Sequence, residues 1–225
     1  MSLKSSLFLR SRLDKTFPMS GLPFAKTLTL TIAAIGTAWI LSSCSGGGDP
    51  RNGVIVSVKD QRMLLVKNGE PVKSYPISTS KFGLGDRRGS NRTPIGRMEV
   101  ARKIGKGAPA GAVFKSRRRT GEVLRPNAPG RDPIVTRILW LRGKQKSTRN
   151  AFGRYIYIHG TPEERTIGQP RSYGCIRMKS RDIIDLYGKL GVGSEVQVIK
   201  GSLASTQTGK DHVASQSSYL PAAGN

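Results

Sequence analysis

Short runs of β-branched and aromatic residues, separated by clusters of Gly, Pro, Asn and Ser, recur along the chain from residue 51 to residue 200. Such runs are typical of strands that are buried on at least one face. Asn68 and Gly69 stand between two of them and predict a tight hairpin, because both positions accept a positive φ angle. The strands that we expect are residues 54–58, 63–67, 72–77, 97–101, 134–141, 154–159 and 195–199.

Helical periodicity is clear in one segment, residues 180–190. We expect Ser180 to cap its N-terminus, with Asp182 in the first turn and Gly191 just after the end. The apolar stripe that would pack against the core consists of Ile183, Tyr187 and Leu190.

These elements predict a single, mainly β domain over residues 53–200, with a β-sandwich-like packing and a short helix near its C-terminal end. Residues 103–133 are rich in Gly, Pro, Arg and Lys, so we expect a long loop there with one or two irregular strands. Residues 201–225 are mostly Ser, Thr, Gln, Gly and Ala. That composition predicts a disordered polar tail, because it buries too little apolar surface to order itself.

The N-terminal segment has the order of an export signal. Lys26 precedes an apolar run without charges, residues 28–41, and small residues follow. The run is shorter than the ~20 residues that a membrane-spanning helix needs. We therefore expect residues 1–43 to be a signal peptide, with Met19 as an alternative start.

Residues 41–44, Leu-Ser-Ser-Cys, resemble the bacterial lipobox, in which the cysteine carries the lipid of a lipoprotein. The resemblance implies that Cys44 is lipidated and that residues 44–52 form a flexible tether to a membrane. The alternative is an ordinary signal peptide with a chance cysteine. Ser45 after the cysteine resembles lipoproteins that are sent on to the outer membrane rather than kept in the inner one, so we expect a lipoprotein of the cell envelope that faces the periplasm.

The formal net charge is +24, from 38 Lys and Arg against 14 Asp and Glu. A surplus of this size favours anionic partners such as wall polymers, lipid or nucleic acid, although a solvated basic surface is the simpler explanation. No nucleic-acid-binding module is visible in the sequence, and the export signal conflicts with that class of function. We therefore expect no nucleic-acid partner.

The chain has two cysteines. If Cys44 carries lipid, Cys175 is left as a thiol without a disulfide partner, and such a thiol is either inert or reactive. Cys175 follows Gly174 in an expected turn, sixteen residues after His159, which ends an expected strand. From the residues alone, an inert buried Cys175 is an equal alternative to a nucleophile. One Cys and one His without a carboxylate cluster predict no metal site.

A cysteine nucleophile needs a base, and His159 is the candidate for that role. The carbonyl of Gly160 could orient the imidazole, since a buried acidic partner is not obvious in the sequence. The backbone N–H groups of Tyr173, Gly174 and Cys175 could form an oxyanion hole.

The segment His159-Gly160-Thr161, the loop after it and the sequence SYGCIRM at residues 172–178 closely resemble the signature of the L,D-transpeptidase catalytic domain, the YkuD-like family. The resemblance covers roughly residues 53–199, with its motifs in the same order. Upstream and downstream it includes residues 57–63, Asn68-Gly69, residues 78–80, residues 93–96 and residues 195–199.

The resemblance implies that Cys175 is the nucleophile, His159 the base and Gly160 the source of the orienting carbonyl. It also implies that Arg177 is a pocket residue that could bind a substrate carboxylate. Ser172 belongs to the same substrate-binding segment, where a turn role is more natural than a second nucleophile. Tyr173 departs from the family, which usually has His at this position.

The implied activity is transfer on peptidoglycan stem peptides, without a cofactor and by a monomer. Cys175 would attack the bond between a diamino acid at position three and D-Ala at position four, and the thioester would pass to an amine in a 3→3 cross-link. Water as acceptor would make the protein an L,D-carboxypeptidase, and a protein amine would attach that protein to the wall. A non-catalytic peptidoglycan-binding lipoprotein with the same fold is the alternative from another class.

Overall fold

The computed structural model describes residue 49 and residues 51–218. The expected signal peptide, the alternative start at Met19 and the expected lipid site at Cys44 lie outside these residues, as do residues 219–225. The strands are β1 Asn52–Ser57, β2 Arg62–Lys67, β3 Glu70–Pro76, β4 Gly96–Ile104, β5 Ala112–Lys115, β6 Arg118–Val123, β7 Ile134–Gly143, β8 Tyr157–Gly160, β9 Ile176–Met178 and β10 Glu195–Ile199. The helices are α1 Ser180–Lys189 and α2 Gln207–Ser218, with 3₁₀ turns η1 Lys146–Thr148, η2 Glu164–Thr166 and η3 Leu203–Ser205.

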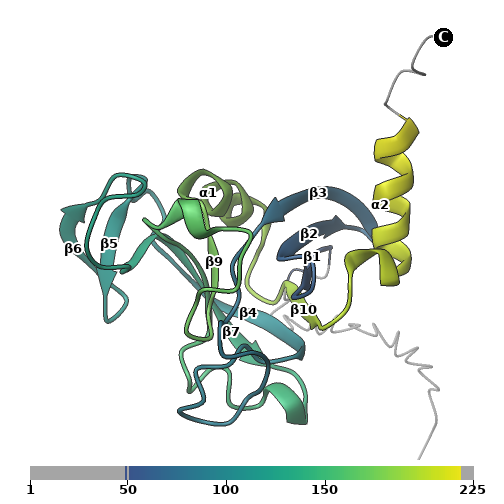
Figure 1. Ribbon diagram of the computed structural model, residues 1–225, viewed down its shortest axis with the longest axis horizontal. Coiled ribbons are helices and arrows are strands. Elements are labelled where there is room, and N and C mark those ends of the chain that lie inside the picture. Colours follow the sequence, from purple (N-terminus) through teal and green to yellow (C-terminus); the bar gives the residue numbers. More distant parts are fainter. Residues whose placement is uncertain (1–48, 50, 219–225) are drawn as a thin grey trace, which may run out of the picture. The chain divides into compact units, whose positions relative to one another are not determined.

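The strands form one mixed, hydrogen-bonded sheet (Figure 1), which confirms the mainly β prediction. Its main path runs β3-β2-β1-β10-β4-β7-β5-β6, while β8 pairs with β7 and β9 pairs with β8. The pairs β1–β10 and β8–β9 are parallel, and the others are antiparallel. The expected hairpin is present between β2 and β3, where both Asn68 and Gly69 have positive φ angles.

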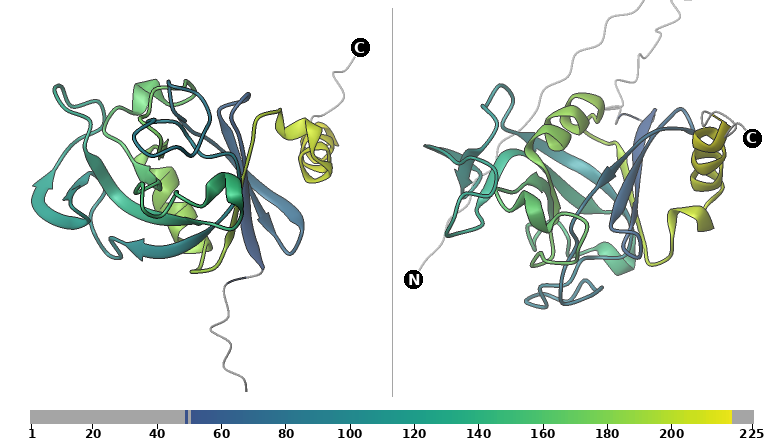
Figure 2. Two further views of the ribbon diagram at one scale, coloured as in Figure 1. Left: turned by 90° about the horizontal axis from the view of Figure 1, so that it is seen from below. Right: turned by 45° about the horizontal axis from the view of Figure 1, so that its top comes forward.

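The main core lies between parts of the sheet that are far apart in the strand order. Val54, Met63 and Tyr75 of β1, β2 and β3 pack in one cluster with Ile158 and Ile176 of β8 and β9. Burial of such side chains contributes about 1.5–3 kcal/mol each. Because the sheet folds back on itself around this cluster, the short strands β8 and β9 are packed at the centre of the domain (Figures 1 and 2).

Helix α1 follows β9 directly and packs on β7 and β8. Its apolar face is as expected, with Ile183 and Leu190 buried. The expected N-cap is wrong: Lys179 occupies the N-cap position and makes no side-chain cap, while Ser180 is the first helical residue. Ser180 is drawn into the interior instead, because its hydroxyl bonds the hydroxyl of Thr136 at 2.8 Å.

The segment between β4 and β7 contains two short strands, as the composition predicted. β5 and β6 pair as a hairpin whose turn is made by Ser116 and Arg117. Both turn residues have positive φ angles although neither is Gly, which is uncommon for residues with side chains. The hairpin therefore holds Arg117 in a fixed place at its tip.

The chain after residue 200 differs from the prediction of a disordered tail. η3 and α2 follow β10, and Leu203 is buried. The carboxylate of Asp60 accepts hydrogen bonds from Leu203 N at 2.6 Å and from Ser202 Oγ at 2.9 Å. Composition does not reveal this order, because the anchor is a single carboxylate far away in the sequence. In the described part of the chain, helices are too short or too polar to cross a membrane.

Candidate active site

His159 lies near the end of β8 and is buried, with 6% of its surface exposed. Its Nδ1 lies 2.8 Å from the carbonyl oxygen of Gly160, which is the contact that the sequence suggested. Because a carbonyl only accepts, Nδ1 carries the proton and Nε2 is left as the basic nitrogen. Burial lowers the pKa of His159; the Gly160 carbonyl and Asp132 oppose this effect, and Arg177 adds to it. The imidazole is therefore neutral at neutral pH and able to accept a proton.

Cys175 is brought to the same face of the sheet as His159 by the pairing of β8 with β9. The parallel register places His159 opposite Arg177. Successive side chains of a strand alternate between its two faces, so Cys175, two residues before Arg177, points to the side of His159. The residues of the other face, Ile158 and Ile176, are fully buried in the main core. The register thus puts Cys175 and His159 on one face of the sheet, in diagonal positions on two adjacent strands.

The surroundings of the Cys175 thiol favour its protonated form. Burial raises the pKa of Cys175 to about 11, against the opposing effects of the Tyr157 backbone N–H, Arg154 and Arg177. Its Sγ lies 3.4 Å from the carbonyl oxygen of Tyr155, to which the thiol can donate. A reactive thiolate therefore has to be generated by proton transfer to a nearby base.

The loop before Cys175 is fixed by a set of hydrogen bonds. Gly174 has φ +117°, and a Cβ there would lie 3.3 Å from the carbonyl oxygen of Arg92, so only glycine fits without strain. Thr93 Oγ1 donates to the carbonyl oxygen of Gly174 at 3.1 Å. Ser172 Oγ donates to the carbonyl oxygen of Cys175 at 2.5 Å and accepts from Gly174 N at 3.3 Å. The Gly174 N–H is thus engaged by Ser172, and the oxyanion hole over residues 173–175 stays a prediction.

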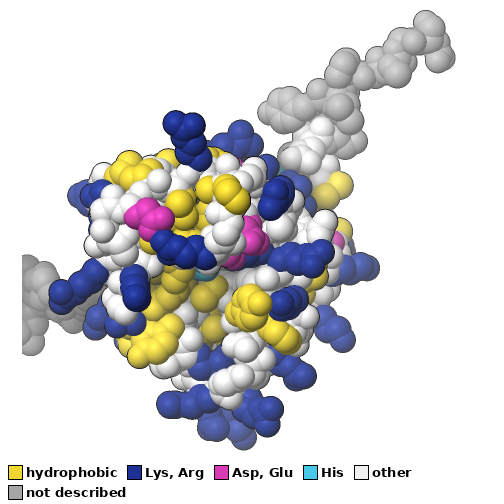
Figure 3. Space-filling model, turned by 60° about the vertical axis from the view of Figure 1, so that its left-hand side comes forward, with side chains coloured by type: hydrophobic (Ala, Val, Ile, Leu, Met, Phe, Trp, Pro, Cys, Tyr) yellow, Lys and Arg dark blue, Asp and Glu magenta, His cyan; other side chains and the backbone are white. Residues whose placement is uncertain are grey.

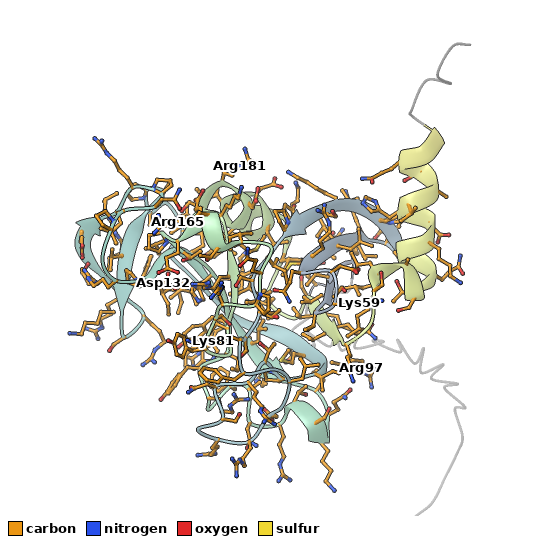
Figure 4. The ribbon with its side chains drawn as sticks, viewed as in Figure 1. Lys59, Lys81, Arg97, Asp132, Arg165 and Arg181 are labelled. Atoms are coloured by element: carbon orange, nitrogen blue, oxygen red, sulfur yellow. The ribbon has the colours of Figure 1, made fainter. Side chains whose placement is uncertain are left out.

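Arg177 is enclosed by protein groups, with only 4% of its side chain exposed. Its Nη1 is paired with the carboxylate of Asp132 and lies 3.4 Å from Glu163, while Nη2 lies 3.0 Å from Thr166 Oγ1 and 3.3 Å from Ser78 Oγ. Figure 4 places Asp132 between the β5–β6 hairpin and β9. These contacts support a structural role for Arg177. Its substrate contact, like that of the buried Ser172, stays a prediction.

Tyr173, at the position where the family usually has His, has 63% of its surface exposed. Lys81 Nζ donates to its hydroxyl at 3.0 Å, and its ring lies 5.6 Å from that of Phe82. The departure therefore falls on an exposed side chain rather than on the buried part of the site.

An aromatic wall lies beside Cys175 and was not foreseen from the sequence. Trp140 stacks on Phe152 with ring centroids 4.2 Å apart, and Tyr157 packs against Trp140 edge-on. Arg117 lies over the rings of Trp140 and Tyr155, at 5.2 and 5.1 Å from their centroids. Cys175 packs against this cluster. The sequence alone did not predict this wall, because its residues come from separate segments of the chain.

The surface of this side of the molecule is mainly apolar and basic. Figure 3 shows one face on which hydrophobic side chains are ringed by Lys and Arg, with few carboxylates and a small area of histidine near the centre. Such a surface favours substrates that carry carboxylates.

The residues around β8 and β9 supply a thiol, a neutral imidazole with a fixed tautomer and a rigid glycine turn, which are the groups that covalent catalysis by cysteine requires. In the part of the chain that the structure covers, no three His, Cys, Asp or Glu side chains lie close enough together to hold a metal ion. The family model of the L,D-transpeptidase catalytic domain, YkuD, matches residues 51–198. The chain belongs to the L,D-transpeptidase family.

Two sequence relatives agree with this assignment. The putative L,D-transpeptidase YqjB of Bacillus subtilis is 24% identical over 180 residues, which are 80% of this chain and 88% of that protein. The probable L,D-transpeptidase ErfK/SrfK of Escherichia coli is 27% identical over 152 residues, which are 66% of this chain and 44% of that protein. The solved structure of an L,D-transpeptidase from Mycobacterium smegmatis shares 14% identity with a TM-score of 0.43, covering 66% of this chain and 58% of that one. The chain spans less than two thirds of the last two proteins.

Proposed function

We propose that this protein is a peptidoglycan L,D-transpeptidase that uses Cys175 as its nucleophile. The observation that carries the proposal is the tautomer of His159: Nδ1 is committed to the Gly160 carbonyl at 2.8 Å, so Nε2 is the nitrogen that can take the thiol proton. The family assignment supplies the substrate class, the stem peptides of peptidoglycan.

The reaction proceeds in two transfers. His159 takes the proton of Cys175, and Sγ attacks the carbonyl carbon between the diamino acid at position three and D-Ala at position four. The carbon–nitrogen bond breaks, His159 returns the proton to the amine of D-Ala, and a thioester remains on Cys175. An amine of a neighbouring stem peptide then attacks the thioester, giving a 3→3 cross-link and restoring the thiol.

The same thioester can pass to other acceptors. Water would release the tripeptide, so that the protein would act as an L,D-carboxypeptidase, and an amine on a protein would attach that protein to the wall. The three outcomes share every residue of the first step. They are separated by analysing the products formed from a stem tetrapeptide with and without an added amine acceptor.

The first experiment is mass spectrometry of the intact protein after incubation with a carbapenem, a β-lactam that acylates an activated thiol. We expect one covalent adduct on the wild type and none on Cys175→Ala, because the thioester forms only at that sulfur. The matched control is His212→Gln on α2, which leaves Cys175 and His159 in place and should still acquire the adduct. A folded wild type without an adduct would count against the proposal and favour the non-catalytic wall-binding lipoprotein, with Tyr173→His as the next variant to test.

We also propose that the protein is a monomer that lipid on Cys44 holds at a membrane of the cell envelope, with its domain facing the periplasm and the outer membrane as the favoured site. The apolar run at 28–41 and the lipobox-like residues 41–44 support this. Growth with a radiolabelled fatty acid should label the wild type and not Cys44→Ala. Equal labelling of both proteins would exclude Cys44 as the lipid site.

A further inference from the structure

A hollow lined by cationic and apolar side chains lies between α1 and the loop that joins β4 to β5. Its volume is about 530 Å³. Three cationic side chains line it, and none of its lining residues is acidic. The lining residues that matter here are Lys103, Lys106, Arg137, Ile184 and Tyr187.

Arg137, from β7, is the deepest of the cations, with 8% of its surface exposed. Its Nη1 donates to the carbonyl oxygens of Ala108 and Thr136, both at 2.6 Å. Nε and Nη2 have no acceptor within the described residues, and neither atom is sealed from solvent. Burial lowers the pKa of Arg137, an effect that Tyr187 opposes. A guanidinium that is buried this deeply is usually paired with an anion. Arg137 has no carboxylate partner among residues 49 and 51–218.

The backbone beside Arg137 is strained. Thr136 has φ +72°, which is an outlier for a β-branched residue, and the β7–β8 register shifts between Val135 and Ile138. The side chain of Thr136 is locked by Gly111 N at 2.9 Å and Ser180 Oγ at 2.8 Å. Bulges of this kind redirect a side chain and occur next to functional sites. Here the bulge lets Arg137 reach α1 while Ile138 stays in the cluster near Cys175.

Lys103 and Arg137 both lie beside the ring of Tyr187. Lys103 Nζ donates to the carbonyl oxygens of Tyr187 at 2.7 Å and of Leu190, and it lies 4.4 Å from the Tyr187 ring centroid. Arg137 Cζ lies 5.6 Å from the same centroid. Lys106 is exposed at the rim of the hollow.

The carboxylate of Asp49 acts on Lys103 from outside the hollow. Burial lowers the pKa of Lys103, and Asp49 acts in the opposite direction. Asp49 is already bonded to Asn52 Nδ2 at 2.9 Å, Gly191 N at 3.2 Å and Ser194 Oγ at 3.3 Å. The hollow therefore keeps a positive potential, and partial burial strengthens it.

We propose that this hollow binds an oxyanion group, a carboxylate or a phosphate, carried on a small molecule. The free donors of Arg137 and the ammonium of Lys106 meet the oxygens, as guanidinium forks do with planar oxyanions. Ile184, which is 37% exposed, and the ring of Tyr187 meet the apolar part of the ligand. The site is separate from the transpeptidase chemistry, because Arg137 and Ile138 project to opposite faces of β7.

The test measures the thermal midpoint of the full-length chain in a non-ionic detergent during titrations with inorganic phosphate and, separately, with glutarate. Sodium chloride at the same ionic strength is the reference. We expect a saturable rise of about 5 °C or more at a hundredfold excess over Kd with at least one of the two probes. The probe that gives the larger rise identifies the source as a phosphate or a carboxylate ligand.

Matched variants at the rim locate the binding. Ile184→Glu places a carboxylate over the cations and should abolish the rise in the thermal midpoint. Ile184→Gln has the shape of the Glu variant without its charge, and it should keep the rise, with a Kd within about threefold of the wild type. Both variants should still form the carbapenem adduct at Cys175, so failure here is distinguishable from failure of the proposed function. A wild type that responds to neither probe beyond chloride, or a response that Ile184→Glu retains, would overturn the proposal.

Discussion

Replacing His159 by Gln should slow acylation of Cys175 by a carbapenem about a thousandfold at pH 8. The pKa of the Cys175 thiol is about 11, so only about one thiol in a thousand is ionised at that pH without help from a base. Gln cannot accept the proton, and loss of a general base costs typically 10²–10⁴-fold. The measurement is the rate of adduct formation, followed by intact mass.

The pH dependence of the two proteins should differ in shape. The wild-type rate should be level through neutral pH and fall only well into the acid range, because burial holds the pKa of His159 below its ordinary value of 6.5 and only the neutral imidazole accepts a proton. The His159→Gln rate should rise about tenfold per pH unit up to about pH 10, since only the thiolate then reacts.

His212 provides the matched control, because it is the other histidine of the chain and lies on α2. His212→Gln should acylate at the wild-type rate. A His159→Gln protein that is folded by circular dichroism and reacts at the wild-type rate would remove His159 from the mechanism. A level pH profile for that variant would have the same meaning.

Replacing Arg177 by Met should lower the free energy of unfolding by about 3 kcal/mol. The change removes a guanidinium that is 4% exposed and leaves Asp132 beside the buried His159 without its partner. Breaking a buried pair costs about 3–5 kcal/mol, and we expect the lower end because the Asp132 side chain is 25% exposed. Urea unfolding followed by circular dichroism measures the effect.

Two further variants show whether the pair is the cause. The double variant Arg177→Met/Asp132→Asn should recover part of the loss, because no unpaired carboxylate remains. Arg165→Met changes an exposed arginine of η2 and should stay within about 0.5 kcal/mol of the wild type. If Arg177→Met unfolds like the wild type but raises KM for a stem tetrapeptide, the arginine binds substrate rather than supporting the site.

Much of the site could be predicted from the sequence because its central parts are local. His159 and Gly160 are adjacent, so the contact between Nδ1 and the Gly160 carbonyl needs only the end of one strand. Gly174 before Cys175 indicates a turn, and the structure has a turn there with φ +117° at Gly174. The hairpin at Asn68 is local in the same way.

Other parts could not be predicted because they join distant segments through single side chains. Asp132 reaches Arg177 and acts on His159 across a loop whose composition shows only that it is irregular. Ser180 is a residue type that often caps the start of a helix. Here its hydroxyl bonds the hydroxyl of Thr136 in the interior instead. Asp60 likewise orders a tail that looks disordered by composition.

The sequence by itself determined the class of fold, the family and the candidate residues for the chemistry, since short apolar runs, turn residues and a local Cys-His signature carry that information along the chain. Only the tertiary structure decided the pKa shifts of the thiol and the imidazole, the enclosure of Arg177 and the cations gathered beside Tyr187. These properties depend on burial and on the field of charges from remote segments. Burial and the field of remote charges arise only when the chain has folded around these groups.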